Sequence, residues 1–164
     1  MVSTTLFCFA PPSKGSIEYT TIFVTPTLPA MIREEIPLKL YAAARPGYDH
    51  GRNRQVSADV VEDWISRAQA TGVKSILCLL DQHHLCLYDS MPGGLLDAYR
   101  AEGFEVGHVP VVDHQWPSLS ENELQRVASL FEQLPKPVLI HCSAGMDRTG
   151  TAVKHIKLHL MPSA

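Results

Sequence analysis

Residues 137–150 read PVLIHCSAGMDRTG, and this stretch decides both the fold and the chemistry that the sequence predicts. The apolar run 137–140 indicates a buried strand, and a helical pattern follows Arg148. Between them, a loop of small residues and glycine separates Cys142 from Arg148. A strand, a tight loop and a helix start, in this order, can direct several backbone N–H groups at one anion. The sequence therefore predicts an anion site with a thiol and a guanidinium at its two ends.

Cys142 and Arg148 have complementary chemistry for a phosphate group. The positive end of a helix dipole favours the thiolate, which is the nucleophilic form of cysteine. The planar fork of Arg148 matches two phosphate oxygens. A nucleophile beside a phosphate cradle predicts an enzyme that attacks phosphorus.

The composition is that of a single globular domain. The chain has 164 residues, 45% hydrophobic and 19% charged, which fits one domain with a real core. Its formal net charge of −3 gives no overall basic field for nucleic acid. No apolar run reaches the length of a membrane helix, and the first residues lack the basic region of a signal peptide. Four scattered cysteines favour a reducing, cytoplasmic setting.

Strands and helices alternate along most of the chain. The expected strands are Leu38–Ala43, Ser75–Leu80, Phe104–Val112 and Val138–His141. The expected helices follow Ser57, Gly94, Ser120 and Arg148. This order predicts an α/β domain over residues 37–164, with a central, mainly parallel sheet flanked by helices. Residues 1–36 are expected to form an irregular segment with one strand, Tyr19–Val24, packed on that domain.

Asp113 follows the strand that precedes the Cys142 strand along the chain. In open parallel sheets, ligands lie beyond the carboxyl ends of the strands, where such loops face each other. Asp113, on a loop with Trp116 and Pro117, is therefore the expected proton donor to a leaving group.

The stretch His141-Cys142 through Arg148-Thr149-Gly150 resembles the signature loop of the cysteine-based protein tyrosine phosphatases, in their small, dual-specificity-like branch. The resemblance extends over roughly residues 38–160 and implies that family's α/β fold. It implies a phosphocysteine on Cys142, oxygen binding by Arg148, and acid catalysis by Asp113. Thr149 would donate to the departing thiolate, and His141 would orient the loop. The phosphate-binding residues it implies are Ser143, Ala144, Gly145, Met146, Asp147 and Arg148.

Other polar residues have weaker functional interpretations. Arg45, Arg52, Arg54 and His114 are expected to rim the site, although a solvated loop would explain the arginines equally well. Cys78 lies in an apolar strand and is expected to be a buried structural residue. His83, His84 and Cys86 lack a fourth ligand at suitable spacing, so we expect no metal and no cofactor.

Two departures from the family pattern bear on the substrate. Asp147 stands where many protein phosphatases carry a small or neutral residue, as in some phosphoinositide-acting and bacterial branches, and it could brace the loop by an outward salt bridge. The loop's variable positions hold no lysine, which favours phosphorylated proteins or peptides over multiply phosphorylated lipids. The second departure is the short C-terminal helical part, since only fourteen residues follow Gly150.

These observations leave several functions open. The expected activity is hydrolysis of phosphotyrosine, and also of phosphoserine and phosphothreonine, on proteins. The alternatives are a phosphoinositide phosphatase and a non-catalytic phosphate-binding module. Apolar surface left by the short C-terminal part would be covered by residues 1–36 or by a second chain, so a monomer and a homodimer both remain open.

Overall fold

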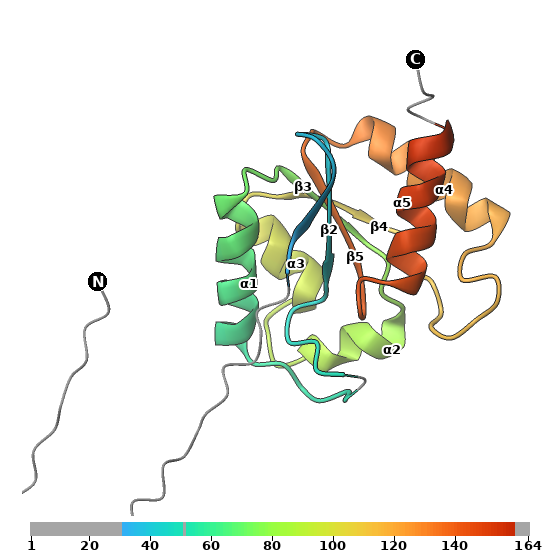
Figure 1. The fold of residues 1–164 in the computed structure, drawn as a ribbon. Coiled ribbons are helices and arrows are strands. Elements are labelled where there is room, and N and C mark those ends of the chain that lie inside the picture. The colour runs from blue at the N-terminus through green and yellow to red at the C-terminus, as the bar shows by residue number, and fades with distance from the viewer. Residues whose placement is uncertain (1–30, 51, 160–164) are drawn as a thin grey trace, which may run out of the picture.

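A computed structural model describes residues 31–50 and 52–159. These residues form a five-stranded sheet in the order β1-β2-β5-β3-β4, with helices on both faces (Figure 1). The strands are β1 (Arg33–Ile36), β2 (Leu40–Ala44), β3 (Ser75–Cys78), β4 (Glu105–His108) and β5 (Val138–Cys142). Only β1 is antiparallel to its neighbour. The prediction of an α/β fold with a mainly parallel sheet is confirmed.

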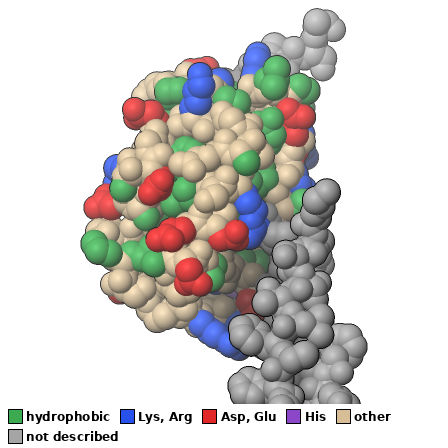
Figure 2. Space-filling view, turned by 90° about the vertical axis from the view of Figure 1, so that its left-hand side faces the viewer, with side chains coloured by type: hydrophobic (Ala, Val, Ile, Leu, Met, Phe, Trp, Pro, Cys, Tyr) green, Lys and Arg blue, Asp and Glu red, His purple; other side chains and the backbone are tan. Residues whose placement is uncertain are grey.

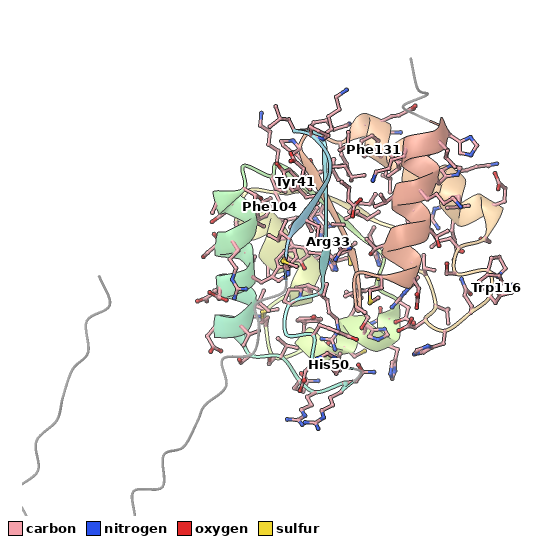
Figure 3. The ribbon with its side chains drawn as sticks, viewed as in Figure 1. Arg33, Tyr41, His50, Phe104, Trp116 and Phe131 are labelled. Atoms are coloured by element: carbon pink, nitrogen blue, oxygen red, sulfur yellow. The ribbon has the colours of Figure 1, made fainter. Side chains whose placement is uncertain are left out.

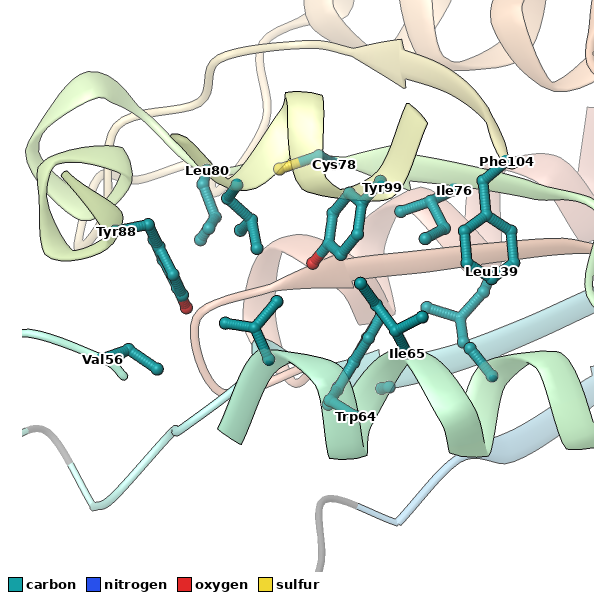
Figure 4. Close-up of a cluster of buried hydrophobic side chains, with 14 of the residues drawn as sticks. Val56, Trp64, Ile65, Ile76, Cys78, Leu80, Tyr88, Tyr99, Phe104 and Leu139 are labelled. Carbon is teal, nitrogen blue, oxygen red and sulfur yellow. The ribbon is translucent and has the colours of Figure 1, made fainter. Parts of the chain in front are cut away.

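Two apolar cores lie on opposite faces of this sheet. The longer helices are α1 (Ala58–Ala70), α3 (Gly94–Ala101), α4 (Glu121–Gln133) and α5 (Asp147–His159). Helices α1 and α3 pack on one face, and Figure 4 shows Trp64, Tyr99 and Leu139 in that core. Helices α4 and α5 cover the other face. Strands β3 and β5 are buried along their whole length, as their apolar sequences predicted.

The outward side of α1 is polar. Its exposed residues include Asp59, Glu62 and Asp63, and Figure 2 shows acidic side chains on the face of the molecule on which α1 lies. None of the described helices has the length and apolar character that a membrane-spanning helix requires.

Some boundaries differ from those that the sequence predicted. Strand β1 was not predicted, because its sequence, Arg-Glu-Glu-Ile, lacks apolar alternation. The second strand begins at Leu40 rather than Leu38, since Leu38 has a positive φ of 55° and is exposed in the turn. Beyond β4, Val109 and Val111 stay buried and donate backbone hydrogen bonds to Cys78 and Leu79. The strand predicted at 19–24 lies outside the described residues.

A short helical segment follows β3 at its carboxyl end. Helix α2 (Gln82–Leu85) continues into a single 3₁₀ turn, η1 (Cys86–Tyr88). This helix was not predicted from the sequence, because four residues are too few to show helical periodicity. Asp81 caps α2 by accepting a hydrogen bond from the backbone N–H of His84 at 3.0 Å. This cap places His84 near the carboxyl edge of the sheet.

Candidate active site

The loop between β5 and α5 lies at the centre of the sheet's carboxyl edge. Strand β5 lies between β2 and β3 and ends at Cys142, and α5 begins at Asp147. Gly145 in this loop has a φ of +68°, and a Cβ there would collide with the backbone of Ala43. The close approach of loop and β2 therefore requires glycine.

Two arginines hold the loop from outside the signature stretch. Arg33 of β1 donates to the carbonyl oxygen of Gly145 at 2.8 Å, and Figure 3 labels it on this strand. The backbone N–H of Arg45 donates to the Ser143 carbonyl at 3.0 Å, and its Nε donates to Ser143 Oγ at 3.2 Å. β1 and the end of β2 thus fix the loop through charged hydrogen-bond donors.

Arg45 is not a rim residue, contrary to the prediction. Its side chain is completely buried, and it also donates to Tyr88 Oη at 3.4 Å and to Asn53 Oδ1 at 3.3 Å. Within the described part of the chain, no carboxylate pairs with it. A buried guanidinium without a carboxylate adds positive potential directly beside the loop.

Arg148 is nearly fully buried at the first turn of α5, with 2% of its surface exposed. Its Nη1 donates to the carbonyl oxygen of Val111 at 2.8 Å. Its Nη2 lies 3.0 Å from Oδ2 of Asp113. The guanidinium is thereby oriented by the chain beyond β4, and one of its donor positions faces a carboxylate oxygen. A phosphate oxygen offers the same acceptor chemistry and can take that place.

One cavity of about 280 Å³ brings the predicted chemical groups together. Cys142, Arg148 and Asp113 all line it, as do the predicted loop residues Ser143, Ala144, Met146 and Asp147 and the predicted rim residue His114. Gly145 shapes the loop without lining the cavity. Arg52 and Arg54 are exposed but do not line the cavity either.

His141 is buried in the core beneath the loop. Burial, followed by smaller contributions that include the charges of Arg148 and Arg45, lowers the pKa of His141 to about 4. Its Nδ1 lies 3.3 Å from the Cys142 carbonyl oxygen, and its Nε2 lies 3.1 Å from Tyr99 Oη. A carbonyl oxygen only accepts, so Nδ1 carries the proton and Nε2 accepts from Tyr99. Both ring nitrogens are therefore engaged in holding the end of β5.

Thr149 is completely buried, and its hydroxyl has no hydrogen-bond partner among the residues that the structure describes. An unpartnered buried hydroxyl is costly unless a ligand or an ionised group uses it.

The other described cysteines have no comparable setting. Burial raises the pKa of the Cys78 thiol to about 12, so this residue is an inert core thiol, as expected. Cys86 is exposed on η1 and does not line the cavity. Among residues 31–50 and 52–159, no cluster of three or more His, Cys, Asp and Glu side chains has the arrangement of a metal site.

Three lining residues were missed as site residues: Tyr48, Asn53 and His84. Tyr48 and Asn53 belong to the polar loop in which the arginines were chosen for their charge. His84 was considered only as a metal ligand. Its carboxylate partner, Asp81, follows the carboxyl end of β3 as Asp113 follows β4. Ligands bind at the carboxyl ends of parallel strands, and this rule alone could have identified Asp81 as a candidate site residue.

A second hollow of about 530 Å³ adjoins the first, and Asp113, His114, Met146, Asp147 and Arg148 line both. Its other walls include the exposed apolar side chains of Val112 and Trp116. Figure 3 shows Trp116 at the outer end of its loop.

Asp147 has no salt bridge to any described residue, so the outward ion pair expected for it is absent from this part of the chain. The Asp147 carboxylate lies in the first turn of α5, where the helix dipole stabilises a negative charge.

The family model described as "Polymorphic toxin system, DSP-PTPase phosphatase" matches residues 51–159, which include the loop, Asp113 and α5. The chain belongs to this family. The match confirms the resemblance to small dual-specificity-like cysteine phosphatases that the signature loop indicated. No curated protein sequence matches the chain.

Solved structures of phosphatases share the fold. A kinase-associated phosphatase with serine in place of its catalytic-site cysteine is 19% identical, with a TM-score of 0.62 over 84% of this chain and 78% of that one. Tk-PTP in its active form is 20% identical, with a TM-score of 0.57 over 80% and 76% of the two chains. A DUF442 protein of Shewanella putrefaciens is 18% identical, with a TM-score of 0.52 over 80% and 74%.

Proposed function

We propose that the protein hydrolyses phosphate monoesters through a phosphocysteine on Cys142, acting on phosphotyrosine and also on phosphoserine and phosphothreonine of proteins. The observation that carries this proposal is the single cavity lined by Cys142, Arg148 and Asp113. Membership of a phosphatase family supports the reaction class.

The residues of the cavity act in two successive steps. The substrate's phosphate takes the place of the Asp113 carboxylate at Arg148, and Arg148 with the loop N–H groups binds its oxygens. The Cys142 thiolate forms a bond to phosphorus as the bond to the leaving oxygen breaks, and Asp113 protonates that oxygen. In the second step, Asp113 takes a proton from water, which attacks phosphorus and releases the thiolate. The free hydroxyl of Thr149 stabilises that thiolate.

The lining of the two hollows favours a substrate with one phosphate at the site. Arg148 is the one arginine and no lysine lines either hollow within the described residues, whereas Asp113 and Asp147 line both. A second or third phosphate on an inositol ring would face carboxylates instead of cations. This charge pattern disfavours the phosphoinositide alternative. A pure binding module has no use for a nucleophile and an acid that line the same cavity.

Phosphate release from a panel of phosphotyrosine, phosphoserine and phosphothreonine peptides, phosphoinositides and nucleotides tests this proposal. We expect release from the peptides to exceed release from the lipids and nucleotides. Cys142→Ser should abolish turnover while the protein still binds inorganic phosphate, because the cradle remains. Cys86→Ser, at an exposed cysteine away from the cavity, is the matched control and should stay active. Full activity of Cys142→Ser would overturn the mechanism.

A further inference from the structure

The ring of His84 lies between two carboxylates at the edge of the catalytic cavity. Its Nδ1 is 2.8 Å from Oδ1 of Asp81, and its Nε2 is 3.6 Å from Oδ2 of Asp113. The His84 side chain is 4% exposed, and those of Asp81 and Asp113 are 16% and 25% exposed. A buried imidazole that links the cap of α2 to the expected acid has no part in the reaction as described above.

The contacts of Asp81 decide which nitrogen of His84 carries a proton. Burial alone would raise the pKa of Asp81, but hydrogen bonds from the backbone and ring of His84 outweigh it and lower this pKa. Asp81 is therefore a carboxylate, which only accepts hydrogen bonds, so Nδ1 carries a proton and donates it. In the neutral ring, Nε2 is left with a free lone pair that faces Asp113.

The surroundings of His84 come from four segments of the chain. Asp81 and His83 belong to its own segment, and the rings of His83 and His84 meet edge to face at 5.5 Å. Asp113 and His114 come from the acid loop, where His114 is an exposed neighbour of the same carboxylate. The remaining titratable or charged residues lining the cavity are Tyr48, Cys142, Asp147 and Arg148.

We propose that Asp81 and His84 form a positioning pair that holds the Asp113 carboxyl group for proton transfer. This inference rests on the proposed phosphatase reaction. When a substrate phosphate occupies Arg148, Asp113 loses its partner there, and His84 Nε2 is the buried polar atom that remains beside Oδ2, since His114 Nε2, at 3.8 Å, belongs to an exposed side chain. A shift of a few tenths of an ångström brings the 3.6 Å separation to hydrogen-bond length.

Asp81 and His84 position the proton that Asp113 transfers, and neither residue gains or loses a proton. Protonated Asp113 has one oxygen that bears hydrogen and one that does not. The hydrogen on Oδ2 is donated to the lone pair of His84 Nε2, which holds the carboxyl group at the cavity. When the leaving oxygen replaces Nε2 as the acceptor, the proton moves to that oxygen, which becomes a hydroxyl. Asp113 is then a carboxylate and regains a proton from the attacking water. His84 keeps its Nδ1 proton, donated to Asp81, in both steps, so all protons are accounted for.

The test compares substrates that need an acid with substrates that do not. A nitrophenyl phosphate releases a stable phenolate, whereas phenyl phosphate releases a strongly basic one that must be protonated. In His84→Ala, we expect kcat/KM, which covers only the steps up to release of the leaving group, to fall by about tenfold or more for phenyl phosphate, a part of the 10²–10⁴ that an acid contributes, while kcat/KM for the nitrophenyl ester changes little. His84→Gln, which retains a polar group near the Nε2 position, should recover part of the loss.

Two further measurements separate positioning from mere folding. His83→Gln changes the exposed neighbouring histidine and should leave both rates unchanged. In an Asp113→Asn background, His84→Ala should cause no further loss, because the acid that it positions is already gone. Binding of inorganic phosphate, measured on each variant, reports whether the loop remains intact.

The outcomes distinguish this inference from the proposed function. Equal losses for both esters in His84→Ala, or a full further loss in the Asp113→Asn background, would overturn the positioning role and leave the phosphatase reaction standing. A wild-type protein that releases no phosphate from any substrate would overturn the proposed function itself. A loss confined to phenyl phosphate, rescued by glutamine and absent without Asp113, is the result that the geometry predicts.

Discussion

At the scale of single residues, His141 couples the stability of the fold to pH. Its pKa is lowered from the usual 6.5 to about 4 in the folded protein, chiefly by burial. The folded protein therefore binds a proton on His141 only at a lower pH than the unfolded chain does. This contribution to stability is complete above pH 6.5 and is lost as the pH falls towards 4. The loss amounts to about 3 kcal/mol at most.

Urea unfolding at pH 7.5 and at pH 5 checks this expectation. The wild-type protein should lose more stability between the two pH values than His141→Asn does, because asparagine has no proton to bind. His83→Gln, at an exposed histidine, should lose as much unfolding free energy between the two pH values as the wild-type protein does. The same loss in His141→Asn would show that the His141 ring is not the titrating group.

The residues of the site were predictable where their roles lie along one stretch of chain. Cys142 and Arg148 are six positions apart on one loop, so their spacing alone implies that they meet. Asp113 followed from the rule for the carboxyl ends of parallel strands, and the structure places it 3.0 Å from Arg148. Arg45 was misplaced because sequence does not show whether a polar side chain turns outward or beneath a neighbouring loop. The contact of His84 with Asp113 joins segments that no local pattern relates.

At the scale of elements, α4 and α1 provide a matched test of helix capping. Ser120 forms a capping box with Glu123 at the start of α4, immediately after the acid loop. Ser57, at the start of α1, makes no side-chain capping hydrogen bond although its sequence position predicted one. Ser120→Ala should therefore destabilise the protein by about 1 kcal/mol, and Ser57→Ala should cost clearly less. Urea unfolding of the two variants measures the difference. Equal losses of unfolding free energy would contradict the conclusion that Ser120 caps its helix through its side chain and Ser57 does not.

The same elements show what sequence patterns can and cannot predict. Strands β3 and β5 were predicted because burial on both faces demands continuous apolar runs. Strand β1 is an edge strand with a charged sequence, so its place depends on pairing with β2 and not on its own pattern. Its register nevertheless matters to the site, because it delivers Arg33 to Gly145.

At the scale of the whole molecule, the two cores hold the sheet so that its carboxyl edge stays open to ligands. The loops after β3, β4 and β5 and the loop after β2 converge there, and all four contribute residues to the cavity. Val112, Trp116 and Met146 are among the few large apolar side chains exposed in the described part of the chain, and all three line the adjoining hollow. Their shared location indicates a surface for the part of the substrate beyond its phosphate.

Trp116 is 96% exposed, so it contributes little to the fold, and its removal should act on the substrate alone. Trp116→Ala should raise KM for a phosphopeptide with an apolar neighbour of the phosphorylated residue about tenfold, since a large aromatic contact would be lost. Inhibition by inorganic phosphate should not change, because phosphate reaches only the loop and Arg148. Leu158→Ala, at an exposed apolar residue near the far end of α5, should leave both values unchanged. If Trp116→Ala weakened phosphate and peptide equally, Trp116 would be acting on the loop, and the adjoining hollow would have no role in substrate binding.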